Sequence, residues 1–568
     1  MIVRRILIFS IVLFTLSAAV FAAHQLIAPK EPALAGMMPD GALFYIESPD
    51  FHGLLSDWSN SPEKQAWLKS DNYAVFSQSR LFGRLSQAQS EFATSAGLPP
   101  DMQFVLQIAG KESAFAWYDI GKLEFLYITR LPSFVFSQSA LWQSRGKFET
   151  RQSGKVSFYV RTDPESQRTV AFASVDDWVV LGTREDLVAD ALALIGGAQA
   201  RTLRDEAWFS DSVSAAKSTG DLRMVLDLEK LVPSPYFRSY WIQQNITEMK
   251  QYRAAISDLY RDKQVYREER VLLRKNSDNP ASGDIAQLAA AVPTNIGFYD
   301  AIALPSSKQV VDILREKLLD PRAHSEQIYH DAPTVTMPDI NAGQASDFET
   351  RIDRAPALPK EADPWQPLQA LLDTSQVNGI LVCESSAMPG SGTFAQFHTA
   401  VVLSSGSDWN AGQWKSMVAS TLEPQVTTSQ LGLTWSNRQG YLELDGLLPL
   451  SFHVEGKYLI LSNDAELLLA IHDQLSHMPS QSEPAVYISG FNHAQEQGNF
   501  RRVTTFIDRA GMRGGSAESN DPNQPRQPAF FSGNVASFSQ VFSALASESI
   551  VVRNAGHNVT QTVTYQWQ

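Results

Sequence analysis

The stretch that decides the fold is Val170–Leu192, "VAFASVDDWVVLGTREDLVADAL", because it returns later as Leu450–Ile471, "LSFHVEGKYLILSNDAELLLAI". Leu181 of the first copy matches Leu461 of the second at a constant offset. In each copy a polar pair divides two apolar segments, and the apolar positions that follow recur at helical spacing. Each copy therefore predicts a strand, a two-residue turn, a second strand and a helix.

The polar cluster between the second strand and the helix supplies candidates for the helix N-cap. Thr183 stands there in the first copy, and Asn463 or Asp464 stands there in the second. These residue types accept hydrogen bonds from the free N–H groups of a first helical turn. We expect one of them to cap the helix in each copy.

A second pair of similar segments lies upstream of the two copies. "MPDGALFYIE" from Met38 resembles "VPTNIGFYDA" from Val292, with a proline and a Phe-Tyr pair at matching places. The offset between these segments is smaller, so the second unit carries a net insertion, which we place at about 321–370. The fold class predicted is α+β: tandem duplicated units of mostly antiparallel sheet packed with helices, preceded by an N-terminal hydrophobic helix.

The chain divides into six predicted parts. They are an N-terminal signal peptide or membrane anchor (1–30), a first α+β unit (38–235), a connecting helix and strand (236–290), a second α+β unit (291–511), a flexible loop (512–528) and a C-terminal helix with a β-hairpin that closes the fold (529–568).

The connecting segment contains an apolar stripe at helical spacing. Ile242, Ile246, Met249, Ile256 and Tyr260 belong to this stripe, which predicts one helix over 236–261. The helix would either cover the protein's own sheets or dock on a partner. The following "VYREERVLLRK" alternates in the manner of a strand.

The N-terminus has the pattern of an export signal. Arg4 and Arg5 precede the apolar run Ile6–Ala23, which is followed by no cysteine for lipid attachment. A basic start, an apolar segment and small residues form a secretory signal, and a run of this length can also remain as an anchor. In both cases the arginines stay in the cytoplasm and the rest of the chain is exported.

Composition excludes some classes of function. The net charge is −14, so binding to nucleic acid is not expected. The single cysteine, Cys383, lies in a strand-like segment and allows no internal disulfide. It is either a buried small side chain or a reactive thiol, and the pattern favours the first reading.

Catalytic motifs occur only outside the context that they need. Ser214–Lys217 fits S-x-x-K, but the other motifs of the serine-acylating enzymes are missing. The "GSGTFA" at Gly390 precedes a strand-like segment instead of the helix that a dinucleotide loop requires. The pair Asp176–Asp177 lies in a predicted hairpin turn, where aspartate is common. We assign no catalytic and no cofactor-binding residue.

Histidines are scattered, and we assign no metal ligand from the sequence. The nearest pairs are His324 with His330 and His472 with His477, and neither has the spacing of a zinc-binding helix. Aromatic residues are numerous, and Trp117, Tyr118, Phe125 and Tyr127 lie in two neighbouring predicted strands. They belong either to a core, which the pattern favours, or to a cavity for an apolar ligand.

The stretch Met37–Leu68, "MMPDGALFYIESPDFHGLLSDWSNSPEKQAWL", resembles the opening of a loose group of bacterial cell-envelope proteins of unknown function. The block "DDWVVLGTREDLVADALALIGG", followed by "TLRDEAWFSD", is similar to a block that recurs in that group. The resemblance implies export in a Gram-negative-type cell and an α+β fold. It implies no activity, and it carries no functional residue to this chain.

Three functions remain open. The first is a non-enzymatic scaffold of the cell envelope, in the periplasm or anchored to the inner membrane, that binds partner proteins. The second is a periplasmic carrier or sensor of an apolar ligand such as a lipid, which requires a dry pocket of several hundred Å³. The third is an enzyme whose residues meet only in three dimensions.

Overall fold

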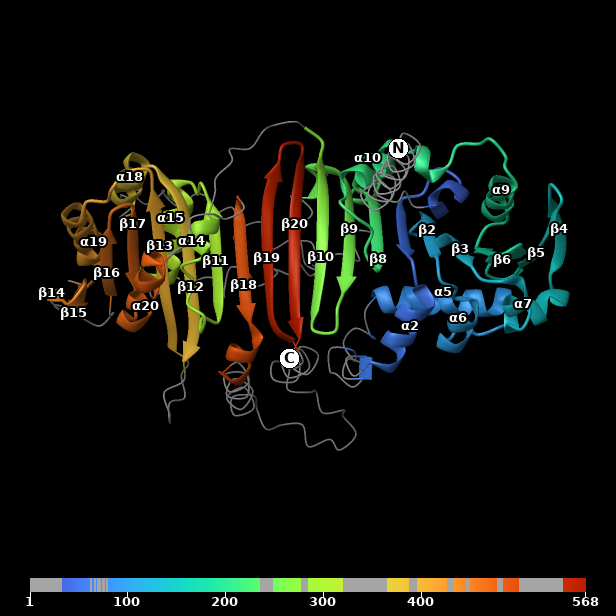
Figure 1. Cartoon of the computed structure of the whole chain (residues 1–568), viewed down its shortest axis with the longest axis horizontal. Coiled ribbons are helices and arrows are strands. Elements are labelled where there is room, and N and C mark those ends of the chain that lie inside the picture. Colours follow the sequence, from blue (N-terminus) through green and yellow to red (C-terminus); the bar gives the residue numbers. More distant parts are fainter. Residues whose placement is uncertain are drawn as a thin grey trace, which may run out of the picture. The chain divides into compact units, whose positions relative to one another are not determined.

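The computed structural model describes most of the chain and divides it into two compact units. The described ranges are 33–61, 80–234, 249–276, 285–319, 365–387, 396–426, 434–445, 450–477, 484–499 and 545–567, with single positions between 64 and 77. The first unit comprises residues 1–280 and 504–568, and the second comprises 281–503. Figure 1 labels the strands and helices of both.

The first unit is built on one antiparallel sheet whose strands pair in the order β4–β5–β6–β7–β3–β2–β1–β8–β9–β10–β20–β19. In that order the strands are Glu149–Ser153, Val156–Thr162, Thr169–Val175, Trp178–Gly182, Glu124–Arg130, Ser113–Asp119, Phe44–Ser48, Leu222–Asp227, Tyr252–Arg261, Val265–Arg274, Asn558–Trp567 and Leu545–Ala555.

The second unit repeats most of that order. Its strands pair antiparallel as β14–β15–β16–β17–β13–β12–β11–β18. They are Thr434–Arg438, Tyr441–Asp445, Leu450–Glu455, Tyr458–Ser462, Gln396–Ser405, Val377–Ala387, Phe298–Ala303 and Tyr487–Asn492. The part of the first sheet from β4–β5–β6–β7 through β3–β2–β1 to β8 has the same pairing order as the whole second sheet. Each strand of the second sheet carries a label ten higher than its counterpart in the first.

The twin stretches hold corresponding places in the two sheets. In the first, hairpin β6–β7 leads into helix α9 (Glu185–Ile195), and in the second, hairpin β16–β17 leads into α20 (Ala465–Ser476). Both hairpin turns begin with a left-handed residue, Asp176 with φ 51° and Gly456 with φ 54°. The local prediction of strand, turn, strand and helix is therefore confirmed in each copy.

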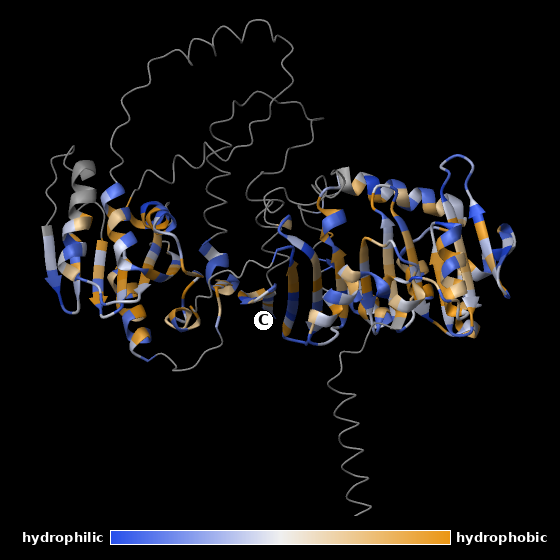
Figure 2. Cartoon of the chain, turned by 90° about the horizontal axis from the view of Figure 1, so that it is seen from above, coloured by the Kyte–Doolittle hydropathy of each residue, from blue (hydrophilic) through white to orange (hydrophobic). Residues whose placement is uncertain are grey.

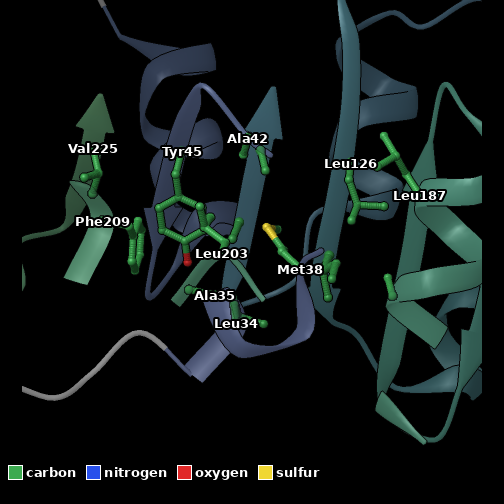
Figure 3. Close-up of a cluster of buried hydrophobic side chains, with 14 of the residues drawn as sticks. Leu34, Ala35, Met38, Ala42, Tyr45, Leu126, Leu187, Leu203, Phe209 and Val225 are labelled. Carbon is green, nitrogen blue, oxygen red and sulfur yellow. The ribbon is translucent and has the colours of Figure 1, made fainter. Parts of the chain in front are cut away.

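Helices cover both faces of the first sheet where β1, β2 and β3 lie. One face packs against the short helices η1 (Ala33–Met37) and η3 (Leu203–Asp205), α9 and α10 (Ala207–Ala215). Figure 3 shows this core, in which the rings of Tyr45 and Phe209 lie side by side. The other face packs against α2 (Phe51–Asn60), α5 (Arg80–Ala96), α6 (Met102–Ile108), α7 (Ser133–Phe136) and α8 (Ala140–Gln143).

The second sheet is likewise packed on two faces. The helices α14 (Ala286–Ala289) and α20 contribute to one buried cluster. The helices α15 (Ser307–Leu314), α18 (Gln366–Ser375) and α19 (Ala411–Val426), with the π-helical turn η5 (Arg315–Leu319), contribute to the other. Figure 2 shows hydrophobic residues alternating with polar ones along the strands of each unit.

One predicted helix is wrong where the structure describes it. Residues 252–261, the second half of the helix predicted over 236–261, form strand β9 between β8 and β10. Two of the apolar positions chosen for the helix, Ile256 and Tyr260, fall within β9, and their even spacing also places them on one face of a strand. Ile256 is buried on that face. Residues 236–248 lie outside the described part of the chain.

The C-terminal hairpin belongs to the first unit, because β20 pairs with β10. Val559 and Val563 of β20 are buried, and so is Leu545 of β19. The helix expected before the hairpin, the loop 512–528, most of the insertion 321–370 and the N-terminal segment 1–30 lie outside the described residues. Among the described residues, no helix is both long and apolar enough to cross a bilayer.

Candidate functional site

An apolar pocket of about 330 Å³ lies in the first unit, between the sheet and helices α2, α5 and α6. Its floor is formed by strands β2 and β3, and its walls by the three helices. A pocket of this size is in the range that binds small molecules, and its lining is mostly apolar. It is the strongest candidate for a functional site among the described residues.

The floor of the pocket is aromatic because of strand alternation. Phe115 and Trp117 of β2 point to the pocket face, whereas Ala114 and Ala116 point to the opposite core. Phe115 stacks on Tyr127 of β3 with 4.4 Å between ring centroids. The small alanines let η1 approach the opposite face closely, and the large rings remain available on the pocket side.

Two of the helices begin at aspartate N-caps. Asp50 accepts a hydrogen bond from the Gly53 N–H at the start of α2, and Asp101 accepts one from the Phe104 N–H at the start of α6. These bonds satisfy backbone donors that would otherwise lie beside an apolar cavity. The helices then present apolar side chains to the pocket: Phe51 from α2, Leu85, Ala88 and Phe92 from α5, and Phe104, Val105 and Ile108 from α6.

Tyr127 and Thr183, which line the pocket, are already hydrogen-bonded within the protein. The Tyr127 hydroxyl donates to the Ile108 carbonyl and contacts the Ser113 hydroxyl, each at 3.2 Å. Burial raises the pKa of Tyr127 to about 12, so the phenol stays neutral. Thr183 accepts a hydrogen bond from the Phe125 N–H at 2.9 Å. These groups leave the interior of the pocket apolar and uncharged.

One charged side chain lines the pocket, and it is neutralised. Arg168 donates to Glu91 of α5 through two nitrogens, at 2.7 and 3.2 Å, and to the Lys122 carbonyl. Arg84 of α5 donates to the Gly121 carbonyl in the same β2–β3 turn. These bonds fasten α5 over the pocket while leaving no unpaired charge among its lining residues.

The structure separates the four aromatic residues that the sequence grouped. Trp117, Phe125 and Tyr127 line the pocket, but Tyr118 lies on the opposite face, where its hydroxyl donates to the Pro39 carbonyl. The helical walls were not predicted. Their residues follow β1 in the sequence, and no local pattern shows that α5 and α6 fold over β2 and β3.

The second unit carries different residues at the positions of the pocket floor. Strand pairing aligns Phe115 with Val382 and Tyr127 with Val401. The same pairing aligns Trp117 with Glu384, which accepts a hydrogen bond from Lys317 at 2.9 Å. The aromatic floor is therefore a property of the first unit among these aligned positions.

The predicted helix caps are partly wrong. Asp464 caps α20 by accepting from the Glu466 N–H, as predicted. Thr183 and Asn463 instead accept from the backbone N–H of the adjacent strand, at Phe125 and Thr399. The side chains satisfy the last donor of the sheet, which competes with the helix for the same acceptor.

Other residues singled out from the sequence fall into ordinary settings. Cys383 is buried in β12, and burial raises the pKa of its thiol. Ser214 hydrogen-bonds to the Ser210 carbonyl within α10. Gly390, His324 and His330 lie outside the described residues.

The two remaining histidines are not a pair in the structure. His472 contacts His453 and Glu455 of β16, whereas His477 hydrogen-bonds to the Asp473 carbonyl at the end of α20. Nothing in the spacing along the chain links His472 to His453, because one lies on a helix and the other on a strand. Their proximity becomes visible only when α20 is packed on the sheet.

Comparison with known proteins yields little. Neither a family model nor a curated protein sequence matches the chain. It is similar to structures titled "Structure of crystal form I of TP0453" and "Structure of crystal form IV of TP0453", at 13% and 10% identity with TM-scores of 0.23 and 0.24. The first alignment covers 44% of this chain and 81% of that chain. TM-scores this low carry no conclusion about fold or function.

Proposed function

We propose that this protein is a non-enzymatic, exported protein of the cell envelope whose first unit binds an apolar ligand with a hydrocarbon chain. The observation that carries the proposal is the pocket of about 330 Å³ with its aromatic floor and apolar helical walls. A carrier of this kind requires a dry pocket of several hundred Å³, which a solid core would not provide. The two-unit architecture would then be a tandem duplication in which one unit holds the ligand.

The size and lining of the pocket suit one alkyl chain. Its volume equals that of about eleven water molecules at ~30 Å³ each. Transfer of alkyl groups out of water contributes about 0.8 kcal/mol per methylene, so about eight buried methylenes give about 6 kcal/mol. The cost of association reduces this gain, so we expect affinities no tighter than on the order of 100 µM for a single-chain ligand.

The pairing of Arg168 with Glu91 determines which head groups are favoured. Because the guanidinium is already neutralised, it offers no free positive charge to a fatty-acid carboxylate. We expect dodecanol to bind about as well as laurate. Selection would therefore rest on the chain, with the head group left at the mouth of the pocket in water.

The enzyme hypothesis finds no support at this pocket. Tyr127 and Arg168 are the titratable residues that line it, and both have partners within the protein. Catalysis by proton transfer needs converging groups that can exchange a proton near neutral pH. The expectation of partner proteins stays a prediction, as does the export role of residues 1–30.

The test is native mass spectrometry of the full-length protein with added laurate. We expect one laurate per chain on the wild-type protein and at least tenfold less on Ala88→Trp, because Ala88 lines the pocket from α5 and indole would fill it. Ser86→Trp is the matched control, since Ser86 is exposed on the same helix. Equal occupancy in the two variants, or no laurate on the wild type, would overturn the proposal.

A further inference from the structure

Three side chains of metal-binding type meet in the second unit, far along the chain from the pocket. His453 and Glu455 alternate on strand β16, so they share one face of the sheet, and His472 lies on helix α20 above them. Their ligand atoms all lie within 4.8 Å of one another. Two imidazoles and one carboxylate form a set that binds Zn²⁺ in proteins.

The spacing of the three groups is close to that of a coordination shell. Glu455 Oε2 lies 3.5 Å from His472 Nε2 and 3.9 Å from His453 Nε2. Ligands at about 2.0–2.2 Å from a tetrahedral zinc ion are roughly 3.3–3.6 Å apart. Small side-chain rotations would bring all three into range, and the exposed Glu455 is free to make the largest one.

His453 is prepared to act as a ligand. Its Nε2 is buried with no hydrogen-bond partner among the described atoms, and Glu455 Oε2 lies 3.9 Å away. A buried polar atom of this kind can be satisfied by a bound ion.

The first unit has apolar residues at the positions that correspond to these three side chains. The shared strand pairing and hairpin–helix succession align His453, Glu455 and His472 with Ala173, Val175 and Leu192. The apolar trio packs α9 onto the sheet as part of the buried core. In the second unit, an apolar contact between helix and sheet is thus replaced by three polar side chains, one of which has a buried, unpartnered nitrogen. A polar group buried in this way costs stability unless a partner compensates it.

We propose that His453, Glu455 and His472 bind one divalent transition-metal ion of the zinc class. Two imidazole nitrogens and one carboxylate oxygen favour Zn²⁺, Co²⁺ or Ni²⁺ over Mg²⁺ and Ca²⁺, which prefer oxygen ligands. The ion joins α20 to β16, and water fills the remaining coordination position on the exposed side. The site takes the place of the apolar contact that holds α9 in the first unit.

The experiment is equilibrium dialysis of the untagged full-length protein against ZnCl₂, followed by thermal unfolding with and without the ion. We expect one zinc per chain and a rise in Tm that EDTA reverses. Replacement by Co²⁺ should give the visible absorption of a four-coordinate site. No binding to the wild type would overturn the proposal.

Three variants locate the ion. Glu455→Gln removes the charged ligand from an exposed side chain, and His472→Leu restores the residue type of Leu192, so both should fold. Each should weaken zinc binding roughly tenfold or more. His477→Ala, on the same helix and away from the cluster, is the control and should bind as the wild type does. Unchanged binding in Glu455→Gln and His472→Leu, or an equal loss in His477→Ala, would contradict the assignment.

Discussion

Trp117 and Glu384 occupy corresponding positions in the two units, because each pairs with the phenylalanine that opens the first strand, Phe44 and Phe298 respectively. The indole lines an apolar pocket, whereas the carboxylate accepts a hydrogen bond from Lys317. The same backbone position therefore carries part of the aromatic floor of the pocket in one unit and a member of an ion pair in the other. The two units share a fold, and the chemistry at this position depends on the side chain.

The size of the pocket floor should set the length of chain that binds. Phe115→Val introduces the residue that the second unit carries at Val382 and enlarges the pocket. We expect the ratio of palmitate to laurate affinity to rise several-fold, with a loss of roughly 2 kcal/mol in stability from the lost ring. Competition binding measures the ratio. An unchanged ratio would show that the chain does not reach Phe115.

Trp117 should report ligand entry directly. A terminally brominated laurate quenches tryptophan fluorescence on contact, so it should quench a saturable fraction of the emission of the wild-type protein. Trp117→Phe keeps the pocket aromatic and removes the reporter, and this saturable fraction should then disappear. Persistence of the same quenching in Trp117→Phe would mean that laurate binds elsewhere.

The stability of the first unit should decrease as the pH rises from about 4.5 to 7. Burial raises the pKa of Glu47 to about 7 from its ordinary value of 4.5, against the hydrogen bond from Tyr45 and the charge of Arg223. A carboxyl whose pKa is higher in the folded state binds its proton more tightly there. Its contribution is complete below the unfolded pKa and is lost as pH rises through 7.

Glu47→Gln isolates this effect. The amide stays neutral and still accepts a hydrogen bond from the Tyr45 hydroxyl. Urea unfolding should show similar stability for variant and wild type at pH 5. At pH 8 the variant should be more stable, by at most about 3 kcal/mol. If the difference in stability between variant and wild type is the same at pH 5 and pH 8, the pKa of Glu47 is not raised in the folded protein.

The ion pair between Arg223 and Asp258 should be sensitive to the loss of one partner. The two side chains are 0% and 3% exposed and form two hydrogen bonds, at 2.8 and 2.9 Å. Asp258→Ala leaves a buried guanidinium unpaired, so we expect a loss of about 3–5 kcal/mol. Asp312→Ala breaks the exposed pair with Lys308 and should cost less than about 0.5 kcal/mol.

The outcome can be read from urea midpoints followed by tryptophan fluorescence. The double variant Arg223→Met/Asp258→Leu removes both charges and should recover most of the loss. Equal, small losses in Asp258→Ala and Asp312→Ala would show that the buried pair is replaceable by water.

The twin hairpin turns offer a matched pair of backbone tests. Gly456 and Asp176 both adopt a left-handed φ, and a Cβ at Gly456 would meet no atom closer than 3.7 Å. Gly456→Ala should therefore cost about 1–2 kcal/mol through backbone strain alone. Asp176→Gly should be neutral or slightly stabilising. Thermal unfolding measures both, and a neutral Gly456→Ala would contradict the strain.

The spacing of apolar residues correctly predicted the two hairpin–helix stretches. It gave the wrong element where the same spacing fits both a helix and a strand. Val170–Leu192 contains its own turn and its own change from strand to helical periodicity, so neighbouring residues suffice to specify it. Over 252–261 an even-numbered apolar series fits both a helix and a strand. The segment forms a strand because it pairs with β8 on one side and with β10 on the other. β8 is distant along the chain, so a local pattern does not include it.

The candidate sites show the same division. Trp117, Phe125 and Tyr127 could be grouped from the sequence because adjacent strands keep them together, whereas Tyr118 packs against the core on the other face of the sheet. The walls from α5 and α6 could not be grouped with them, since helix packing brings them onto the sheet. His453 and His472 were equally invisible as neighbours.

The sequence by itself determined the sheet-and-helix composition and the two matching hairpin–helix stretches, because these depend on the periodicity of a few consecutive residues. Only the tertiary structure decided which strands are neighbours, where the apolar pocket lies and which side chains share it. These depend on contacts between segments distant along the chain, whose strength comes from burial and not from local pattern.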